Sequence, residues 1–74
     1  MEAEEILDLG TGVTFTVFIL KGRPIGGGGD IRLRYAAVTE WVASVVVRET
    51  NYTDIDEGRA AAERLAESRA QADV

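Results

Sequence analysis

The feature that most constrains the fold is a pair of apolar, period-two segments on either side of a glycine-rich loop. Apolar residues recur at alternate positions through residues 13–20, and the pattern returns through residues 31–41. Side chains of a β-strand point alternately to its two faces, so both segments are predicted to be strands. Residues 22–29, which include four consecutive glycines, cannot continue a strand and are expected to form a mobile hairpin loop. No P-loop lysine motif follows the glycines, so phosphate binding is not expected there.

The alternation also assigns side chains to the two faces of this hairpin. One face carries Val13, Phe15, Val17 and Ile19 on the first strand, and one face of the second strand carries Ile31, Leu33, Tyr35, Ala37, Thr39 and Trp41. Both faces of the first strand become apolar toward residue 20, which indicates a strand that is covered on two sides.

Shorter segments flank the hairpin. Residues 5–9 are predicted to form a short strand, joined to the hairpin by a turn at residues 10–12. Residues 45–52 are rich in β-branched side chains and predict a further strand. The connection at residues 42–44 contains no Gly, Asn or Asp, which is poor turn chemistry. This connection would permit one long strand that crosses to another chain.

The periodicity becomes helical near the C-terminus. Asp54 is followed by Glu57 at the spacing of a capping box, and the next residues are strong helix formers apart from Gly58. Arg59 is spaced to pair with Glu63 on the helix surface. The apolar stripe is thin and consists of Ile55, Ala62, Leu65, Ala66 and Ala70. Such a helix is predicted to lie on a surface, and residues 71–74 are expected to fray.

These elements predict a single α+β domain over residues 1–70, with a curved antiparallel sheet of about four strands and a C-terminal helix. The strands are expected at about residues 5–9, 13–21, 30–42 and 45–53, and the helix at about residues 55–70. A chain of 74 residues buries only about 60% of its unfolded surface, so its own core gives marginal stability. The chain has no Cys and no His, which excludes disulfides and the commonest zinc sites, and no cofactor or metal is expected.

The charge distribution argues against nucleic-acid and membrane partners. The net charge is −5, and acidic residues gather near the N-terminus, at Glu2, Glu4, Glu5 and Asp8. Four bases lie between residues 21 and 34; we expect a solvated basic strand edge, with self-association through charged patches as the alternative. An acidic chain lacks the phosphate neutralisation that supplies nucleic-acid affinity. No apolar run is long enough to span a bilayer and the N-terminus carries no basic, apolar export signal, so a cytoplasmic protein is expected.

Several short segments occur in a recognisable order through most of the chain. They are Ile6-Leu7-Asp8, Gly10-Thr11-Gly12-Val13, Lys21-Gly22-Arg23 with the glycine-rich loop, Ile31-Arg32-Leu33, Tyr35-Ala36-Ala37-Val38, Val46-Val47-Arg48 and Tyr52-Thr53-Asp54 before the helix. This order resembles the C-terminal half of SnoaL-like proteins of the NTF2-like superfamily, the relatives of ketosteroid isomerase, limonene epoxide hydrolase and polyketide cyclases. The resemblance implies a truncated NTF2-like cone, without the N-terminal helices that close the cone in the family. The usual Asp-Gly turn before the last strand is replaced by residues 42–44.

The resemblance also locates the family's acidic positions. The protonated Asp of ketosteroid isomerase falls on Ala37, which has no proton to donate. The Asp that epoxide hydrolases and cyclases place before the strand's closing Tyr falls on Asn51, which cannot act as a general base. Asp54 keeps the family's Tyr-x-Asp spacing, and its capping role explains it without catalysis. Glu49 shares a face with Asn51 by alternation and is a weak catalytic candidate, with an ordinary solvated acid as the alternative.

The concave sheet face is therefore the candidate ligand site. The residues expected to line it are Tyr35, Ala37, Trp41, Val47, Glu49 and Asn51, although aromatic residues at period two are also typical of plain core. We expect a non-catalytic or degenerate SnoaL-like module that self-associates, as a homodimer, and binds a small apolar ligand on this face. The alternative is a cyclase-type or isomerase-type enzyme that another chain completes.

Overall fold

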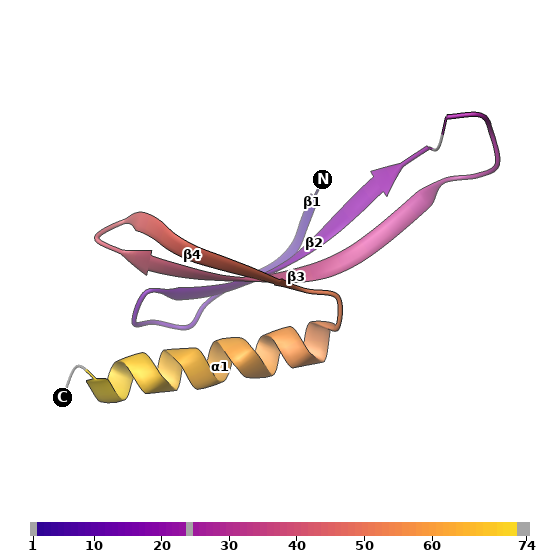
Figure 1. Ribbon diagram of the computed structural model, residues 1–74. Coiled ribbons are helices and arrows are strands. Elements are labelled where there is room, and N and C mark those ends of the chain that lie inside the picture. Colours follow the sequence, from indigo (N-terminus) through magenta and orange to yellow (C-terminus); the bar gives the residue numbers. More distant parts are fainter. Residues whose placement is uncertain (1, 24, 73–74) are drawn as a thin grey trace.

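A computed structural model describes residues 2–23 and 25–72, which form one curved antiparallel sheet and one helix (Figure 1). The strands are β1 (Glu2–Asp8), β2 (Val13–Gly22), β3 (Ile31–Val42) and β4 (Val45–Tyr52), and they lie side by side in sequence order. The helix α1 (Ile55–Ala72) follows β4 and lies along one face of the sheet. The predicted α+β fold is confirmed. Of the predicted C-terminal tail, residues 71–72 belong to α1, and residues 73–74 lie outside the described part of the chain.

The core lies between α1 and the centre of the sheet. Its fully or almost fully buried members are Val13, Phe15, Val17, Ala36, Val38 and Ala62. The β2 members alternate as the sequence predicted, and Phe15 lies opposite Val38 on β3. On α1, Gly58 is buried against the sheet, where an added Cβ would lie 3.0 Å from the Cβ of Ala36 and 3.2 Å from that of Tyr52. Close packing therefore explains a glycine that by itself weakens the helix.

The first turn of α1 is fixed by polar contacts at its start and to the sheet. The backbone N–H of Glu57 donates to Asp54 Oδ1 at 3.1 Å, so Asp54 caps the helix as predicted. Arg59 faces β1 and donates to Glu5 at 2.8 Å, and its guanidinium carbon lies 4.8 Å from the centroid of the Phe15 ring. The hydrogen bond from Arg59 to the Glu5 carboxylate raises the pKa of Arg59. The sheet, and not only the helix surface, therefore provides the acidic partner of Arg59.

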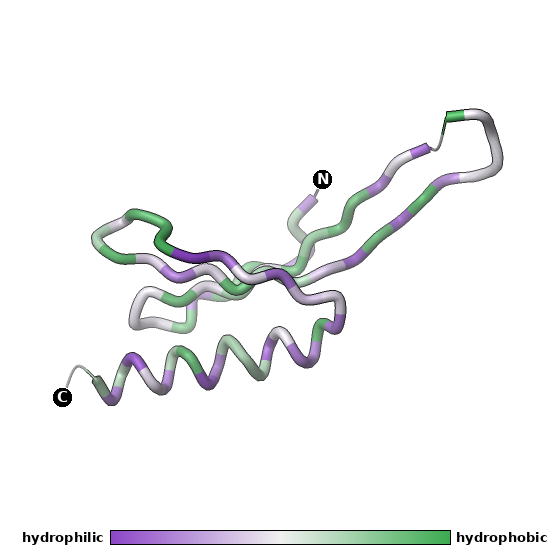
Figure 2. Tube along the Cα trace, in the orientation of Figure 1, coloured by the Kyte–Doolittle hydropathy of each residue, from purple (hydrophilic) through white to green (hydrophobic). Residues whose placement is uncertain are grey.

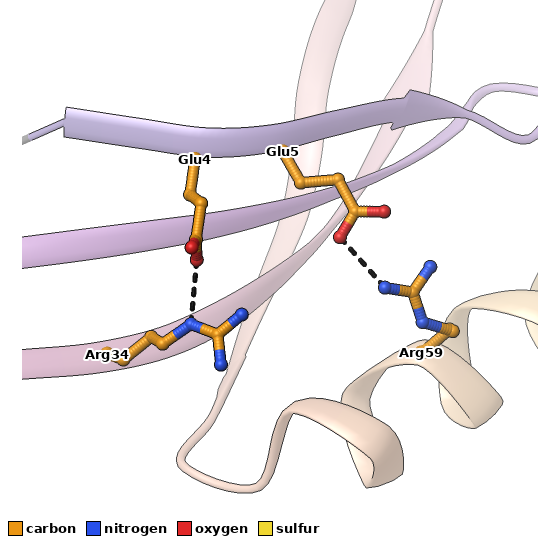
Figure 3. A network of polar contacts seen from close by, with 4 residues as sticks. All are labelled: Glu4, Glu5, Arg34 and Arg59. Atoms are coloured by element: carbon orange, nitrogen blue, oxygen red, sulfur yellow. Dashed lines mark hydrogen bonds and ion pairs between the residues drawn. The ribbon is translucent and has the colours of Figure 1, made fainter.

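Neighbouring acids on β1 reach in two directions (Figure 3). Glu5 points to Arg59 of α1, while Glu4 accepts a 2.7 Å hydrogen bond from Arg34 of β3. The register between β1 and β2 shifts between Ala3 and Glu5, which inserts one extra residue into β1. Such a bulge changes the direction in which successive side chains point.

The C-terminal half of α1 is anchored to the β1–β2 turn. Arg69 donates one hydrogen bond to the carbonyl oxygen of Gly12 and one to that of Trp41, both at 3.0 Å. The Thr11 hydroxyl donates to the carbonyl oxygen of Ala66 at 3.1 Å. Helix, turn and the end of β3 therefore meet at one point.

β3 and β4 are joined by a tight hairpin turn. Val42 pairs with Val45, and the two residues between them, Ala43 and Ser44, have φ angles of 51° and 66°. Two consecutive positive φ angles are typical of a type I′ turn, which normally contains Asn and Gly. In this structure the chain therefore turns back through two strained residues and does not continue as one long strand.

β2 and β3 extend beyond their neighbours as a two-stranded arm, which consists of residues 20–22 and 31–33. β1 pairs with β2 only as far as Ile19, and β4 pairs with β3 only from Ala36. In Figure 1 the arm projects away from α1. The radius of gyration is 14.9 Å, whereas about 11 Å is typical of a compact domain of this length. The arm makes the molecule elongated, with extents of 56 × 24 × 16 Å.

Candidate functional site: the open sheet face

The face of the sheet opposite α1 is not covered by any other described element, and we call it the open face (Figure 1). It consists of Ile6 and Asp8 on β1; Thr14, Thr16, Phe18 and Leu20 on β2; Leu33, Tyr35, Ala37, Thr39 and Trp41 on β3; and Val46, Glu49 and Asn51 on β4. These residues alternate with the core residues that face α1. Figure 2 shows that apolar positions continue from the centre of β2 and β3 into the arm.

The open face is low in its middle and raised on both sides. At the centre Thr16 pairs with Ala37, and their exposed fractions are only 9% and 1%. Toward the arm, Phe18 pairs with Tyr35, and their rings stack with centroids 5.4 Å apart and planes 29° from parallel. Toward the other end lies the Trp41 indole. The face therefore has an aromatic ridge on each side of a shallow dip.

The Trp41 end of the open face is hollowed. Its indole N–H donates to the Thr14 hydroxyl at 3.0 Å, which satisfies the polar edge of the ring within the sheet. A shallow hollow of about 390 Å³ is lined by Asp8, Gly12, Thr14, Trp41, Ala43 and Ser44. Asp8 Oδ1 accepts the Gly10 backbone N–H at 2.9 Å, so this carboxylate shapes the β1–β2 turn. The hollow offers an indole surface beside a carboxylate that is already hydrogen-bonded.

The structure brings five of the six predicted lining residues onto the open face. Tyr35, Ala37 and Trp41 lie along β3. Asn51 lies opposite Ala37, and Glu49 lies opposite Thr39. The predicted residues therefore share one surface, which spans the middle of the sheet and its Trp41 end.

The sixth predicted residue, Val47, lies at an irregularity in β4. Glu40 pairs with Arg48, whereas the next residue, Trp41, pairs with Val46, so Val47 is the extra residue of a bulge. Strict alternation put Val47 on the face of Glu49 and Asn51, whereas the structure pairs Val46 with Trp41 on that face. A one-residue shift in register exchanges the faces of the residues beyond it, and nothing in the sequence of β4 announces this bulge.

The chemistry that this face offers is mainly apolar contact. Glu49 is exposed at the β4 edge, where water surrounds its side chain. Among residues 2–23 and 25–72, no group of three or more acidic side chains could hold a metal ion. The open face also includes Phe18, Leu20 and Leu33, which the site prediction omitted. Leu33 shares the face of Tyr35 by alternation, and the pairing of β2 with β3 shows that Phe18 and Leu20 join it.

Comparison with known proteins found no match for the chain among family models, curated proteins or solved structures. Among the described residues, no helix combines the length and the apolar character needed to cross a membrane.

Proposed function

We propose that this chain is a non-catalytic, self-associating sheet module whose open face packs against the open face of a second copy. The observation that carries the proposal is the apolar surface of that face. Ile6, Leu33 and Val46 are 67%, 48% and 45% exposed, and they add to the aromatic side chains on either side of the centre. Apolar patches larger than a few hundred Å² are rare on soluble monomers and typically mark an interaction site.

The total surface of the molecule supports the same proposal. Its accessible area is 5255 Å², whereas about 4,450 Å² is expected for a monomeric protein of 8.0 kDa. The excess of about 800 Å² is close to the area that each partner buries in a protein–protein interface of standard size. A dimer of this size would bring the chain to the surface expected of a stable folded unit.

A small apolar ligand is the second candidate occupant of the open face, and the hollow beside Trp41 favours it. Its volume of about 390 Å³ lies in the range of about 300–1,000 Å³ that is typical of ligand pockets. This second proposal includes the resemblance to SnoaL-like proteins, which the order of segments in the sequence supports. We place the second copy first because the hollow is shallow and the apolar surface continues far beyond it.

Light scattering coupled to size-exclusion chromatography tests the first proposal. We expect twice the chain mass at micromolar concentration. Trp41 is the single tryptophan, so its emission should shift to longer wavelength when dilution separates the subunits. Leu33→Arg on the open face should give a monomer, while the control Thr50→Arg, opposite the core residue Val38 on the α1 side of β4, should remain a dimer.

A cooperatively folding monomer whose Trp41 emission is independent of concentration would contradict the proposal. If that monomer also bound the apolar dye ANS and the dye were displaced by a small apolar ligand, the second candidate would replace the first.

A further inference from the structure

We infer that the two copies pack with their strands antiparallel, about a two-fold axis beside Ala37, so that the arm of each copy covers the Trp41 end of the other. This inference rests on the proposed self-association and specifies its geometry. Two face-to-face arrangements have two-fold symmetry. In one the axis runs across the strands and the partner's strands are antiparallel; in the other the axis runs along the strands and they are parallel.

The relief of the open face favours the antiparallel arrangement. With the axis beside Ala37, each β3 residue meets the residue equally far beyond the axis, so Tyr35 lies over Thr39 of the partner subunit. The aromatic ridge then fits against small side chains, and Leu33 lies over Trp41 of the partner subunit. The parallel arrangement would instead set the aromatic pair Phe18 and Tyr35 on the same pair of the partner subunit, whereas the dip at Ala37 lies on the partner's dip in both arrangements. Large side chains set on large ones would hold the two faces apart, and since interfaces of stable complexes are packed as densely as protein interiors, this disfavours the parallel arrangement.

The charges favour the same arrangement. Asp8 and Glu49 lie at opposite edges of the sheet in one row, because both belong to the row of Thr14 and Thr39. Parallel packing would put each of these acids over an acid of the partner. Antiparallel packing instead moves both acids to the row of Tyr35 of the partner subunit, away from the partner's Asp8 and Glu49. Juxtaposed like charges therefore select against the parallel arrangement.

The antiparallel arrangement also accounts for two exposed apolar regions at once. The arm presents Leu20, Ile31 and Leu33, and no described element of its own chain covers them. The far end of the open face presents Val46, which is 45% exposed and lies beside Trp41. These regions lie on opposite sides of Ala37, so a two-fold axis at Ala37 places each against the other. A single contact, made twice, removes both from water.

Cysteine cross-linking tests the geometry, because the chain has no cysteine of its own. Leu33→Cys and Val46→Cys are made as separate variants of different mass, mixed and treated with a short bismaleimide. Val46 pairs with Trp41, so in the antiparallel dimer the two introduced thiols are neighbours across the interface. We expect the mixed dimer to be cross-linked at least tenfold more than either variant alone. In each variant alone the two thiols would be about 26 Å apart, eight residues along a strand.

A matched control uses Thr50→Cys, which lies on the α1 side of β4 and should give no cross-link with Leu33→Cys. Strong cross-linking of Leu33→Cys with itself would show the parallel arrangement and overturn the inference. A dimeric mixture with no mixed cross-link would overturn it as well. Both results leave the proposed self-association standing, whereas a monomer in light scattering removes the proposed function itself.

Discussion

At the scale of single residues, the two hairpin turns at the Trp41 end depend on backbone conformation more than on side-chain chemistry. Gly10 and Gly12 both have positive φ, at 78° and 79°. An added Cβ on Gly10 would meet nothing within 4 Å, but on Gly12 it would lie 2.5 Å from the carbonyl oxygen of Trp41. That oxygen also accepts a hydrogen bond from Arg69, so it cannot move without loss. Substituting each glycine in turn therefore distinguishes the free energy lost to a positive φ angle, at Gly10 and Gly12, from the free energy lost to a backbone collision, at Gly12 alone.

We predict that Gly12→Ala destabilises the fold by about 3 kcal/mol, since it combines left-handed strain with a backbone collision. Gly10→Ala should cost only the strain, about 1 kcal/mol. Urea unfolding followed by Trp41 fluorescence gives both values. Equal effects of the two variants would show that the approach of Gly12 to β3 carries no energy of its own.

The β3–β4 turn predicts an improvement in stability. Ala43 and Ser44 adopt positive φ angles that cost non-glycine residues on the order of 1 kcal/mol each. The double substitution Ala43→Asn with Ser44→Gly supplies the residues preferred in such turns and should stabilise the fold by about 1–2 kcal/mol. Ala43→Val should act in the opposite direction, because β-branched residues tolerate positive φ poorly. The urea concentration at the unfolding midpoint measures the effect of each variant. An unchanged midpoint for the double variant would show that Ala43 and Ser44 are not strained.

At the scale of elements, α1 binds the sheet through small residues at its centre and polar contacts near its ends. The buried positions Gly58 and Ala62 offer little apolar area, and Ile55, Leu65 and Ala66 pack on the core while only partly buried, so hydrogen bonds add to a modest apolar contact. Arg69 is the main contact of the last turns, because it joins α1 to the β1–β2 turn and to the end of β3. The helix terminus should therefore loosen when this guanidinium is removed.

We predict that Arg69→Met destabilises the fold by about 2 kcal/mol, since hydrogen bonds to charged groups contribute about 1.5–3 kcal/mol. Amide hydrogen exchange of residues 66–72 should accelerate more than that of residues 55–60. Arg64→Met, at an exposed helix position, is the control and should change stability by less than about 0.5 kcal/mol. Uniform acceleration along α1 would instead indicate that the helix detaches as one unit.

The elements that could be predicted from the sequence are those that a local period determines. Alternation through residues 13–20 and 31–41 located β2 and β3 and their faces, and Asp54 marked the start of α1. Contacts between strands could not be predicted in the same way. The bulge at Val47 and the pairing of Arg59 with Glu5 depend on which strands lie together, and neither has a local signal. The residues predicted to line the site lie on the expected strands and share one face, except that Val46 takes the place of Val47 on β4.

At the scale of the whole molecule, residues of the arm are expected to contribute to association of two copies and not to folding of the single chain. Leu33 pairs with Leu20 in the arm, outside the core between α1 and the sheet. Replacing it should leave the fold of the monomer intact. In the inferred dimer, however, Leu33 of each copy packs on Trp41 of the partner subunit. The Leu33 side chain of each subunit is therefore buried only when the dimer forms.

We predict that Leu33→Ser raises the dimer dissociation constant about 10- to 100-fold, because about 1 kcal/mol or more of apolar burial is lost at each of two equivalent sites. Ile25→Ser is the matched control: Ile25 is fully exposed, yet it lies beyond the end of the partner in the inferred packing and should not change the constant. Sedimentation velocity over a dilution series measures both constants, and urea unfolding at low concentration checks the monomer. If both variants weaken dimerisation equally, the arm associates through non-specific apolar contact, which would contradict the inferred packing. An effect confined to Leu33 is the result expected from burial at a defined position.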